Sequence, residues 1–156
     1  MRLSEFIVQN VDRIVDEWEQ FAQTITPAAH EMDSTALRDH AKDILLAASR
    51  DMTTAQSACE QQAKAEGEGP DNTPALDEAA ASHGELRHTV GFDLVQMTSE
   101  FRHLRACVIR FWDESLINPE RQHFQDMIRF NEAIDEALAE SWKQPDPRRP
   151  KSPNAV

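Results

Sequence analysis

Residues 83–112, HGELRHTVGFDLVQMTSEFRHLRACVIRFW, decide the fold because they contain both a helix start and a long amphipathic helix. Gly91 offers a break, and the Asp93 side chain can accept from the backbone N–H groups that a first helical turn leaves unpaired. Gln96, three residues on, completes a capping box. Apolar residues then recur at three- and four-residue spacing, which predicts one face of a helix from Leu94 to Ser115. That face comprises Leu94, Val95, Thr98, Phe101, Leu104, Val108, Phe111 and Trp112.

The amino-terminal segment predicts another amphipathic helix, from about Ser4 to just before Pro27. Its apolar residues step by three or four positions and form a single stripe. The stripe comprises Leu3, Ile7, Val11, Ile14, Trp18, Phe21 and Ile25. A stripe of this kind can face a neighbouring helix or a second copy of the chain. We favour the first alternative because it needs no partner.

Three further helices follow from local signals. One begins at Asp33 to Thr35 and continues through an Ala-rich stretch to about Ala65. A shorter one runs from Pro74 through Val90, with Gly84 weakening its middle. The last begins at Asn118-Pro119-Glu120. Its predicted inward residues are Phe124, Met127, Ile128, Ile134, Leu138 and Trp142.

These elements predict an all-α fold with four main helices and a shorter one, either bundle-like or globin-like. Residues 1–143 are expected to form one domain, with a flexible loop at about 66–73 that is rich in glycine and acids. Residues 144–156 contain four prolines and no apolar pattern, so we expect a disordered tail.

The composition excludes several classes of function. The 156 residues carry a formal net charge of −12, which argues against binding nucleic acid or an anionic membrane surface. The sequence has neither a transmembrane stretch nor a signal-peptide core, so we expect a cytoplasmic protein. Cys59 and Cys107 lie far apart without metal-ligand spacing, and both are expected to be reduced, buried and inert.

The second half of the chain resembles the RsbRD N-terminal family, a helical module at the front of bacterial histidine kinases and stress-signalling regulators. The resemblance extends from about Leu3 to Trp142, and it is sharp only in the second half. The matching pieces are GFDLVQ at 91–96, EFRHLR at 100–105, VIRFW at 108–112 and RFNEAID at 129–135. Phe101 and His103 depart from the family, whose kinase-linked members tend to carry Tyr and Ala there. The PAS or kinase domain that follows in family members is absent from these 156 residues.

Metal or haem binding is the main chemical alternative. Three Glu-x-x-His pairs, at 85/88, 100/103 and 120/123, have the spacing used by di-iron bundles. The candidate ligands of such a site are Glu100, His103, Glu120 and His123. Their positions around and along their helices do not direct them to one point in the core, so we expect no metal site. A lone histidine ligating haem would require a globin-like fold, and the resemblance points instead to bundles without a cofactor.

Residues 82–89, SHGELRHT, partly match the phosphoacceptor box of histidine kinases. Gly84 separates His83 from Glu85, the proline of the box is missing and no glycine-rich nucleotide-binding region follows, so His83 is expected to be a solvent-facing histidine. Arg102, Arg105 and Arg110 are expected to pair with Glu100, Asp113, Glu114 and carboxylates of neighbouring helices.

The sequence therefore predicts a non-catalytic sensory or regulatory input domain. The resemblance implies a histidine kinase or similar signalling protein as partner, in the same chain or another. We expect a homodimer, and binding of a small apolar ligand is possible under this reading. The candidate relay and interface residues are Asn131, Asp135, Leu138 and Trp142, because the last helix is where family members join their output domains. The alternative is a dimerisation or scaffold domain without a ligand.

Overall fold

The computed structural model describes residues 1–25, 33–68 and 74–143. Over these residues the chain forms six helices and no strand, which confirms the all-α prediction. The helices are α1 (Leu3–Ala22), α2 (Ser34–Thr53), α3 (Ala58–Ala65), α4 (Pro74–Thr89), α5 (Leu94–Ser115) and α6 (Arg121–Lys143). The predicted loop at 66–73 lies partly outside the described residues, and the predicted tail at 144–156 lies wholly outside them.

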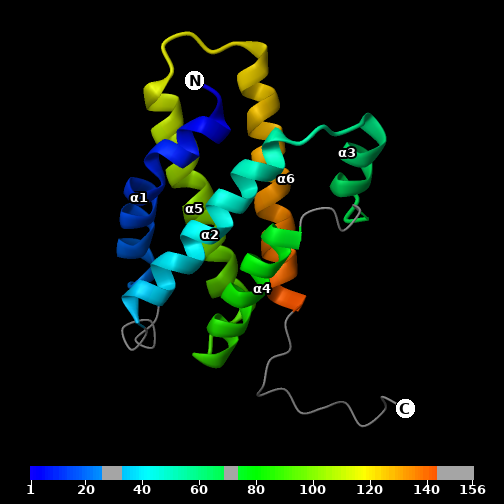
Figure 1. Cartoon of the computed structure of the whole chain (residues 1–156). Coiled ribbons are helices and arrows are strands. Elements are labelled where there is room, and N and C mark those ends of the chain that lie inside the picture. The colour runs from blue at the N-terminus through cyan, green and yellow to red at the C-terminus, as the bar shows by residue number, and fades with distance from the viewer. Residues whose placement is uncertain (26–32, 69–73, 144–156) are drawn as a thin grey trace, which may run out of the picture.

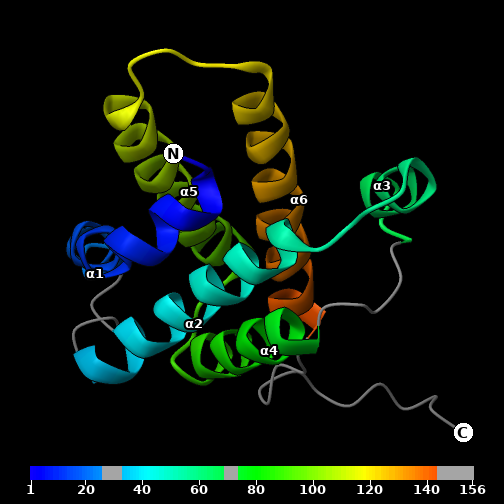
Figure 2. The same cartoon turned by 45° about the horizontal axis from the view of Figure 1, so that its top comes forward.

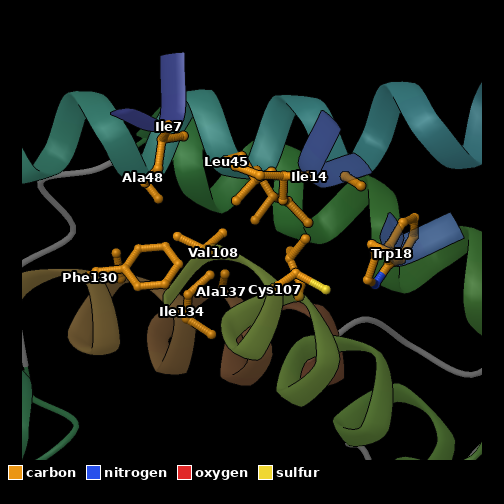
Figure 3. Close-up of a cluster of buried hydrophobic side chains, with 14 of the residues drawn as sticks. Ile7, Ile14, Trp18, Leu45, Ala48, Cys107, Val108, Phe130, Ile134 and Ala137 are labelled. Carbon is orange, nitrogen blue, oxygen red and sulfur yellow. The ribbon is translucent and has the colours of Figure 1, made fainter. Parts of the chain in front are cut away.

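Five of the six helices enclose one core. α1 packs against α2 and α5, and α4 packs against α2 and α6. α2 crosses in front of α5 and α6 at a steep angle in both views (Figures 1 and 2). Figure 3 shows the result: side chains of α1 and α2 meet those of α5 and α6 in a continuous apolar layer. The fold therefore buries one stripe from each main helix, as a bundle requires.

The predicted stripe of α1 is confirmed from Leu3 to Trp18, whereas Phe21, its next member, is only partly buried. Leu3, Ile7, Val11, Ile14 and Trp18 are all buried. The helix ends at Ala22, earlier than predicted, so the stripe stops there and Ile25 follows the helix rather than belonging to it.

The start of α1 is held by α6. Asp126 is buried and accepts from the Arg2 guanidinium, with Nε at 3.0 and 2.8 Å from its two oxygens. The same carboxylate accepts from the backbone N–H of Leu3 at 2.9 Å. Burial alone would raise the pKa of Asp126, but these donors outweigh it and hold the pKa below its usual value. Asp126 therefore joins the first turn of α1 to α6.

The prediction of one helix from Asp33 to about Ala65 was wrong. α2 ends at Thr53, and α3 begins again after a capping box formed by Ser57 and Glu60. A separate start is possible because this serine offers its hydroxyl to the first turn of α3. No residue of α3 is buried, which explains why its sequence carries little apolar pattern.

α5 has the predicted bounds and the predicted Asp93–Gln96 capping box. Asp93 accepts from the backbone N–H of Gln96 at 2.8 Å, and Gln96 accepts from that of Asp93 at 2.9 Å. The predicted face was wrong at its first two positions, because Leu94 and Val95 are exposed. They precede the region that α1 covers, and Met97 is the first buried residue of the helix.

The predicted inward face of α6 was right at Ile134, which is buried, and wrong at Phe124, Ile128 and Trp142. Phe124 is 58% exposed and Ile128 is 47% exposed, whereas the buried face includes Phe130, Ala133 and Ala137. The helix carries two apolar stripes, and the one with small residues faces inward because it allows neighbouring helices to approach closely. On the other stripe Phe124 and Ile128 stay exposed, whereas Met127 and Leu138 are partly buried against the core.

Candidate functional site

The inward face of α4 begins apolar and becomes polar. Leu76 and Ala80 are buried, and the next turns of the same face present His83, Gly84 and Arg87 to the interior. This continues the three- and four-residue spacing of a buried stripe with residues that are seldom fully buried. The helix thus brings a cation and an imidazole into the molecule, where they need partners.

Glu100 of α5 is that partner. Arg87 donates from Nε to Glu100 Oε2 at 2.8 Å and from Nη2 to Oε1, which makes a two-pronged ion pair. His83 Nε2 lies 3.1 Å from Oε2. Because an ionised carboxylate only accepts, this histidine nitrogen carries the proton. Arg87 is 0% exposed, Glu100 1% and His83 2%, so the three groups form a buried cluster.

The surroundings of this buried cluster are apolar and aromatic. The Arg87 guanidinium lies 4.6 Å from the ring centroid of Phe92, and the Phe101 ring meets His83 edge-on at 5.5 Å. Trp18 donates from its indole N–H to the backbone oxygen of Glu100 at 3.2 Å. Desolvation lowers the pKa of Arg87 from its usual value, although the Glu100 charge opposes this.

His40 of α2 stands at the edge of the cluster. Its ring centroid is 6.4 Å from that of His83. Desolvation lowers the pKa of His40, and the nearby His83 and Arg87 lower it further, against the opposing charges of Asp43 and Asp39. The space between Trp18, His83 and Glu100 measures only about 10 Å³, which is room for a single water molecule at most.

The same turn of α4 contacts the end of α6. A methyl group at Gly84 would lie 2.0 Å from the Ser141 carbonyl oxygen, so only glycine permits this approach. Ser141 Oγ donates to the Ala80 carbonyl oxygen at 2.8 Å. One turn further on, the rings of His88 and Trp142 lie 5.4 Å apart. The inward face of α4 therefore contacts both the Glu100 side chain of α5 and the last turn of α6.

These positions correct the prediction that His83 faces solvent, and His88 is buried in the same way. Both are 2% exposed. The error has a physical cause, because the buried Glu100 carboxylate gives His83 a partner from another helix; His88 contacts the partly exposed ring of Trp142. A phosphoacceptor imidazole must be accessible to a kinase domain to accept a phosphoryl group. The burial of His83 therefore argues against the partial match to a phosphoacceptor box.

The four candidate metal ligands lie in separate places. Glu100 is engaged by Arg87 and His83, and His103 stacks on Phe21 with centroids 4.1 Å apart. Burial lowers the pKa of His103. At the start of α6, His123 Nδ1 accepts from the backbone N–H of Glu120 at 2.8 Å. Among the described residues, no three His, Cys, Asp or Glu side chains gather as metal ligands would.

The four relay candidates share the outer side of α6. Asn131 and Leu138 are half-buried, and Asp135 is exposed and pairs with Arg105. Trp142 is 37% exposed and contacts His88. Of these four residues, Trp142 is the one with a described side-chain contact to α4. The last turn of α6, rather than Asn131, therefore contacts the helix that carries the buried cluster.

Arginine pairs of the long helix agree in part with the prediction. Arg110 lies 3.6 Å from Glu114 and 2.9 Å from Glu17 of α1. Glu100, by contrast, pairs with Arg87. The cysteine prediction holds for Cys107, which is free and buried, with a pKa raised by desolvation, but it was wrong for Cys59, which is free and exposed on α3.

Sequence reasoning missed Arg87 and Gly84 as site residues and gave Glu100 the wrong partner. A signal was present: Leu76, Ala80, His83 and Arg87 continue one helical stripe. Because His83 and Arg87 continue the stripe that begins with Leu76 and Ala80, the spacing predicts that both polar residues are buried. The partner of Arg87 lies on a different helix, and spacing along one helix carries no information about it.

The geometry of the buried cluster favours a structural role for Glu100, Arg87 and His83 over a catalytic one. Both oxygens of Glu100 accept hydrogen bonds from Arg87 or His83, so the carboxylate is committed and cannot serve as a general base. No substrate can reach it through a space of about 10 Å³. The buried cluster can, however, hold α4 and α5 in one relative position.

No family model, curated protein or solved structure matches this chain. None of the helices in the described parts of the chain combines the length and the apolar character needed to cross a bilayer. The geometry of the buried cluster and of α6 is therefore the ground on which a function can be inferred.

Proposed function

We propose that this chain is a non-catalytic regulatory input module of the kind found in the RsbRD N-terminal family, with α6 as its output element. In this proposal the module acts in the cytoplasm on a histidine kinase or a similar signalling protein, in the same chain or another. Its signal is the position of the last turn of α6 relative to α4.

The observation that carries the proposal is the double engagement of α4. His83 and Arg87 bind Glu100 of α5, and Gly84 on the same inward face approaches the Ser141 backbone of α6. A shift of α4 against α5 therefore requires either a loss of the buried ion pair or a movement of α6. Packed interfaces of this kind switch between discrete arrangements rather than deforming gradually.

A hydrogen-exchange experiment on the whole chain tests the coupling. Glu100→Gln weakens the ion pair without changing the shape of the side chain, and we expect faster amide exchange in residues 137–143. Leu37→Ala is the matched control, since Leu37 is buried in the first turn of α2. The two variants are compared in urea concentrations that equalise their global stability. Equal protection of 137–143 in both variants would contradict the coupling.

A chimeric kinase tests the regulatory function itself. Residues 1–143 are joined through α6 to the dimerisation and catalytic regions of a histidine kinase, and autophosphorylation is measured. We expect Glu100→Gln and Gly84→Ala to change the rate several-fold while Leu37→Ala leaves it within twofold. A kinase that responds to none of the three variants would rule out α6 as an output element.

Dimerisation without signalling is the second candidate, and a specific observation favours it. The outer stripe of α6 exposes Phe124 and Ile128, and the neighbouring loop exposes 92% of Ile117. Sedimentation distinguishes the two: a dimer that the Glu100→Gln change leaves unaltered, together with an indifferent chimera, would favour a scaffold.

A further inference from the structure

An open groove lies between α5 and α6 near the loop that joins them. The two helices diverge toward this loop in both views (Figures 1 and 2), and the groove between them has a volume of about 650 Å³. Phe124 and Met127 of α6 line one wall, and Phe124 is 58% exposed. One continuous face of α5 lines the other wall. This α5 face comprises Arg102, Ala106, Ile109, Asp113 and Leu116.

The α5 face has the spacing by which two helices pair along their length. Its five residues step by four, three, four and three positions, which is the heptad period of helix pairing. Arg102, Ala106 and Asp113 are exposed, whereas Ile109 and Leu116 are partly buried. The small side chain of Ala106, beside Ile109 at the centre, lets another helix approach closely. Because the described part of the chain covers these residues only in part, the face is available to a partner helix.

The α5 face carries two opposite charges that are unpaired within the chain. Arg102 forms no ion pair with any described carboxylate, and Asp113 forms none with any described cation. The two cannot pair with each other, because eleven helical steps separate them by about 16 Å. The neighbouring Arg105 and Arg110, by contrast, both pair with carboxylates of their own chain. A partner that fits the α5 face therefore presents an acid to Arg102 and a cation to Asp113.

The order of residues on the α5 face is complementary to itself under a two-fold rotation. Positions 102 and 113 share a midpoint with positions 106 and 109, between residues 107 and 108. In an antiparallel pair of α5 helices centred on this midpoint, Arg102 of each copy lies opposite Asp113 of the other, and Ala106 lies opposite Ile109. Such reciprocal contacts are the property of a two-fold interface. A parallel pair would place like charges opposite each other, so the charges select the antiparallel one.

We propose that two copies of this chain join through an antiparallel pair of α5 helices, with α5 of each copy lying in the α5–α6 groove of the other. The four helices form an intermolecular bundle, and Phe124 of α6 packs on α5 of the second copy. Arg102 of each copy pairs with Asp113 of the other, so the interface contains this ion pair twice. The inference assigns a surface and a direction to the dimer expected from the sequence. It does not depend on the relay through α6, because association is measured without any output.

Charge reversal tests the pairing, and sedimentation equilibrium of the whole chain gives the dissociation constant of the dimer. Arg102→Asp and Asp113→Arg should each raise this constant at least tenfold, because each change turns two attractions into two repulsions. An equimolar mixture of the two variants should associate about as tightly as the wild type, since opposite charges again face each other. Both positions are exposed, so urea unfolding should show that neither variant loses its fold.

Arg50→Asp is the matched control. Arg50 is exposed on α2 away from the groove and forms no ion pair with a described carboxylate, and its reversal changes the net charge by the same amount as Arg102→Asp. The control should dimerise like the wild type. A monomeric wild type, or a mixture that stays monomeric, would overturn the proposal. Reversed variants that dimerise like the wild type would place the contact elsewhere, for example on the outer stripe of α6 at Ile128, and would also refute it.

Cross-linking tests the direction of the pair. Arg102→Cys and Asp113→Cys are each made together with Cys59→Ser, which removes the exposed thiol, and are treated with a short bismaleimide at concentrations where both variants dimerise. Mass spectrometry of the mixed variants should find a bridge between positions 102 and 113. The Arg102→Cys variant alone should give no bridge, because an antiparallel pair keeps its two thiols at least about 16 Å apart. A bridge from 102 to 102, or the absence of one from 102 to 113, would overturn the antiparallel assignment.

Discussion

At the residue scale, the informative position is Glu100, because its carboxylate forms a two-pronged ion pair with the buried Arg87 guanidinium. A buried ion pair adds little net stability, since desolvation of both charges offsets their attraction. Its removal one partner at a time is a different matter, because a bare charge then stays in an apolar interior. This asymmetry gives the first prediction.

Glu100→Leu alone should destabilise the fold by about 3–5 kcal/mol, since it removes the carboxylate that pairs with the buried Arg87 charge. The double variant Arg87→Met with Glu100→Leu should recover most of that loss, because neither charge remains. Urea unfolding of the wild type, both single variants and the double variant measures the coupling. Additive losses in the double variant would show that the two side chains do not form the pair described.

Gly84 gives a prediction of opposite sign to helix propensity. In an ordinary helix interior, Gly→Ala stabilises by about 1 kcal/mol. Here the added methyl would lie 2.0 Å from the Ser141 oxygen, so Gly84→Ala should instead destabilise by about 1–3 kcal/mol. Thermal unfolding measures the change, and Ser82→Ala at an exposed site two residues earlier is the control. A gain in stability for Gly84→Ala would mean that α4 and α6 do not approach so closely.

At the element scale, α6 shows where a local pattern is insufficient. Its two apolar stripes are both compatible with an amphipathic helix, and the sequence alone favoured the one with the larger side chains. The structure buries the other, in which Ala133, Ala137 and Ser141 allow α4 to approach and Phe130 fills the core. The choice depends on the shape of the neighbouring helices.

Substitutions on the two stripes of α6 test this orientation. Phe130→Ala should cost about 3–5 kcal/mol because it empties part of the core. Phe124→Ser and Ile128→Ser should each change stability by less than about 0.5 kcal/mol because both side chains are largely exposed. Chemical denaturation of the three variants gives the comparison. Large losses at 124 and 128 with a small one at 130 would restore the phase expected from the sequence.

Other elements were predictable because their signals are local. The Asp93–Gln96 capping box fixed the start of α5, and Pro74 fixed the start of α4 to the residue. The stripe of α1 was correct because it is the only apolar stripe on that helix. The buried cluster was not predictable, since Arg87 and Glu100 lie on different helices and their pairing depends on how these helices cross. Sequence reasoning succeeded within helices and failed between them.

At the scale of the whole molecule, acid is expected to unfold the chain partly through Asp126. Its pKa is lowered in the folded state, so its contribution to stability is complete above its ordinary value of 3.8 and is lost as the pH falls through the lower folded value. Glu19 of α1 behaves alike: burial opposes the shift, but hydrogen bonds from Ser34 and Arg38 lower its pKa from 4.5. The free energy of unfolding should therefore fall below about pH 4.5.

Asp126→Asn should cost about 1–3 kcal/mol at pH 7, since Arg2 and the Leu3 N–H lose their charged acceptor. It should also make the stability curve flatter between pH 5 and pH 2 than that of the wild type, as the variant has one fewer group to protonate. Urea midpoints across this range measure the slope, with the exposed Glu85→Gln as control. A variant whose slope equals that of the wild type would show that Asp126 does not carry the acid response.

The contact between Gly84 and Ser141 also constrains how this chain can vary over time. Any substitution at 84 needs an accompanying change that moves the final turn of α6 outward, and a bulkier residue near 141 meets the same obstacle from the other side. Substitutions at positions 84 and 141 should therefore be correlated across descendants of this sequence, although 57 positions separate them along the chain. A descendant that has lost the glycine should also differ in the angle at which its last helix leaves the body of the protein.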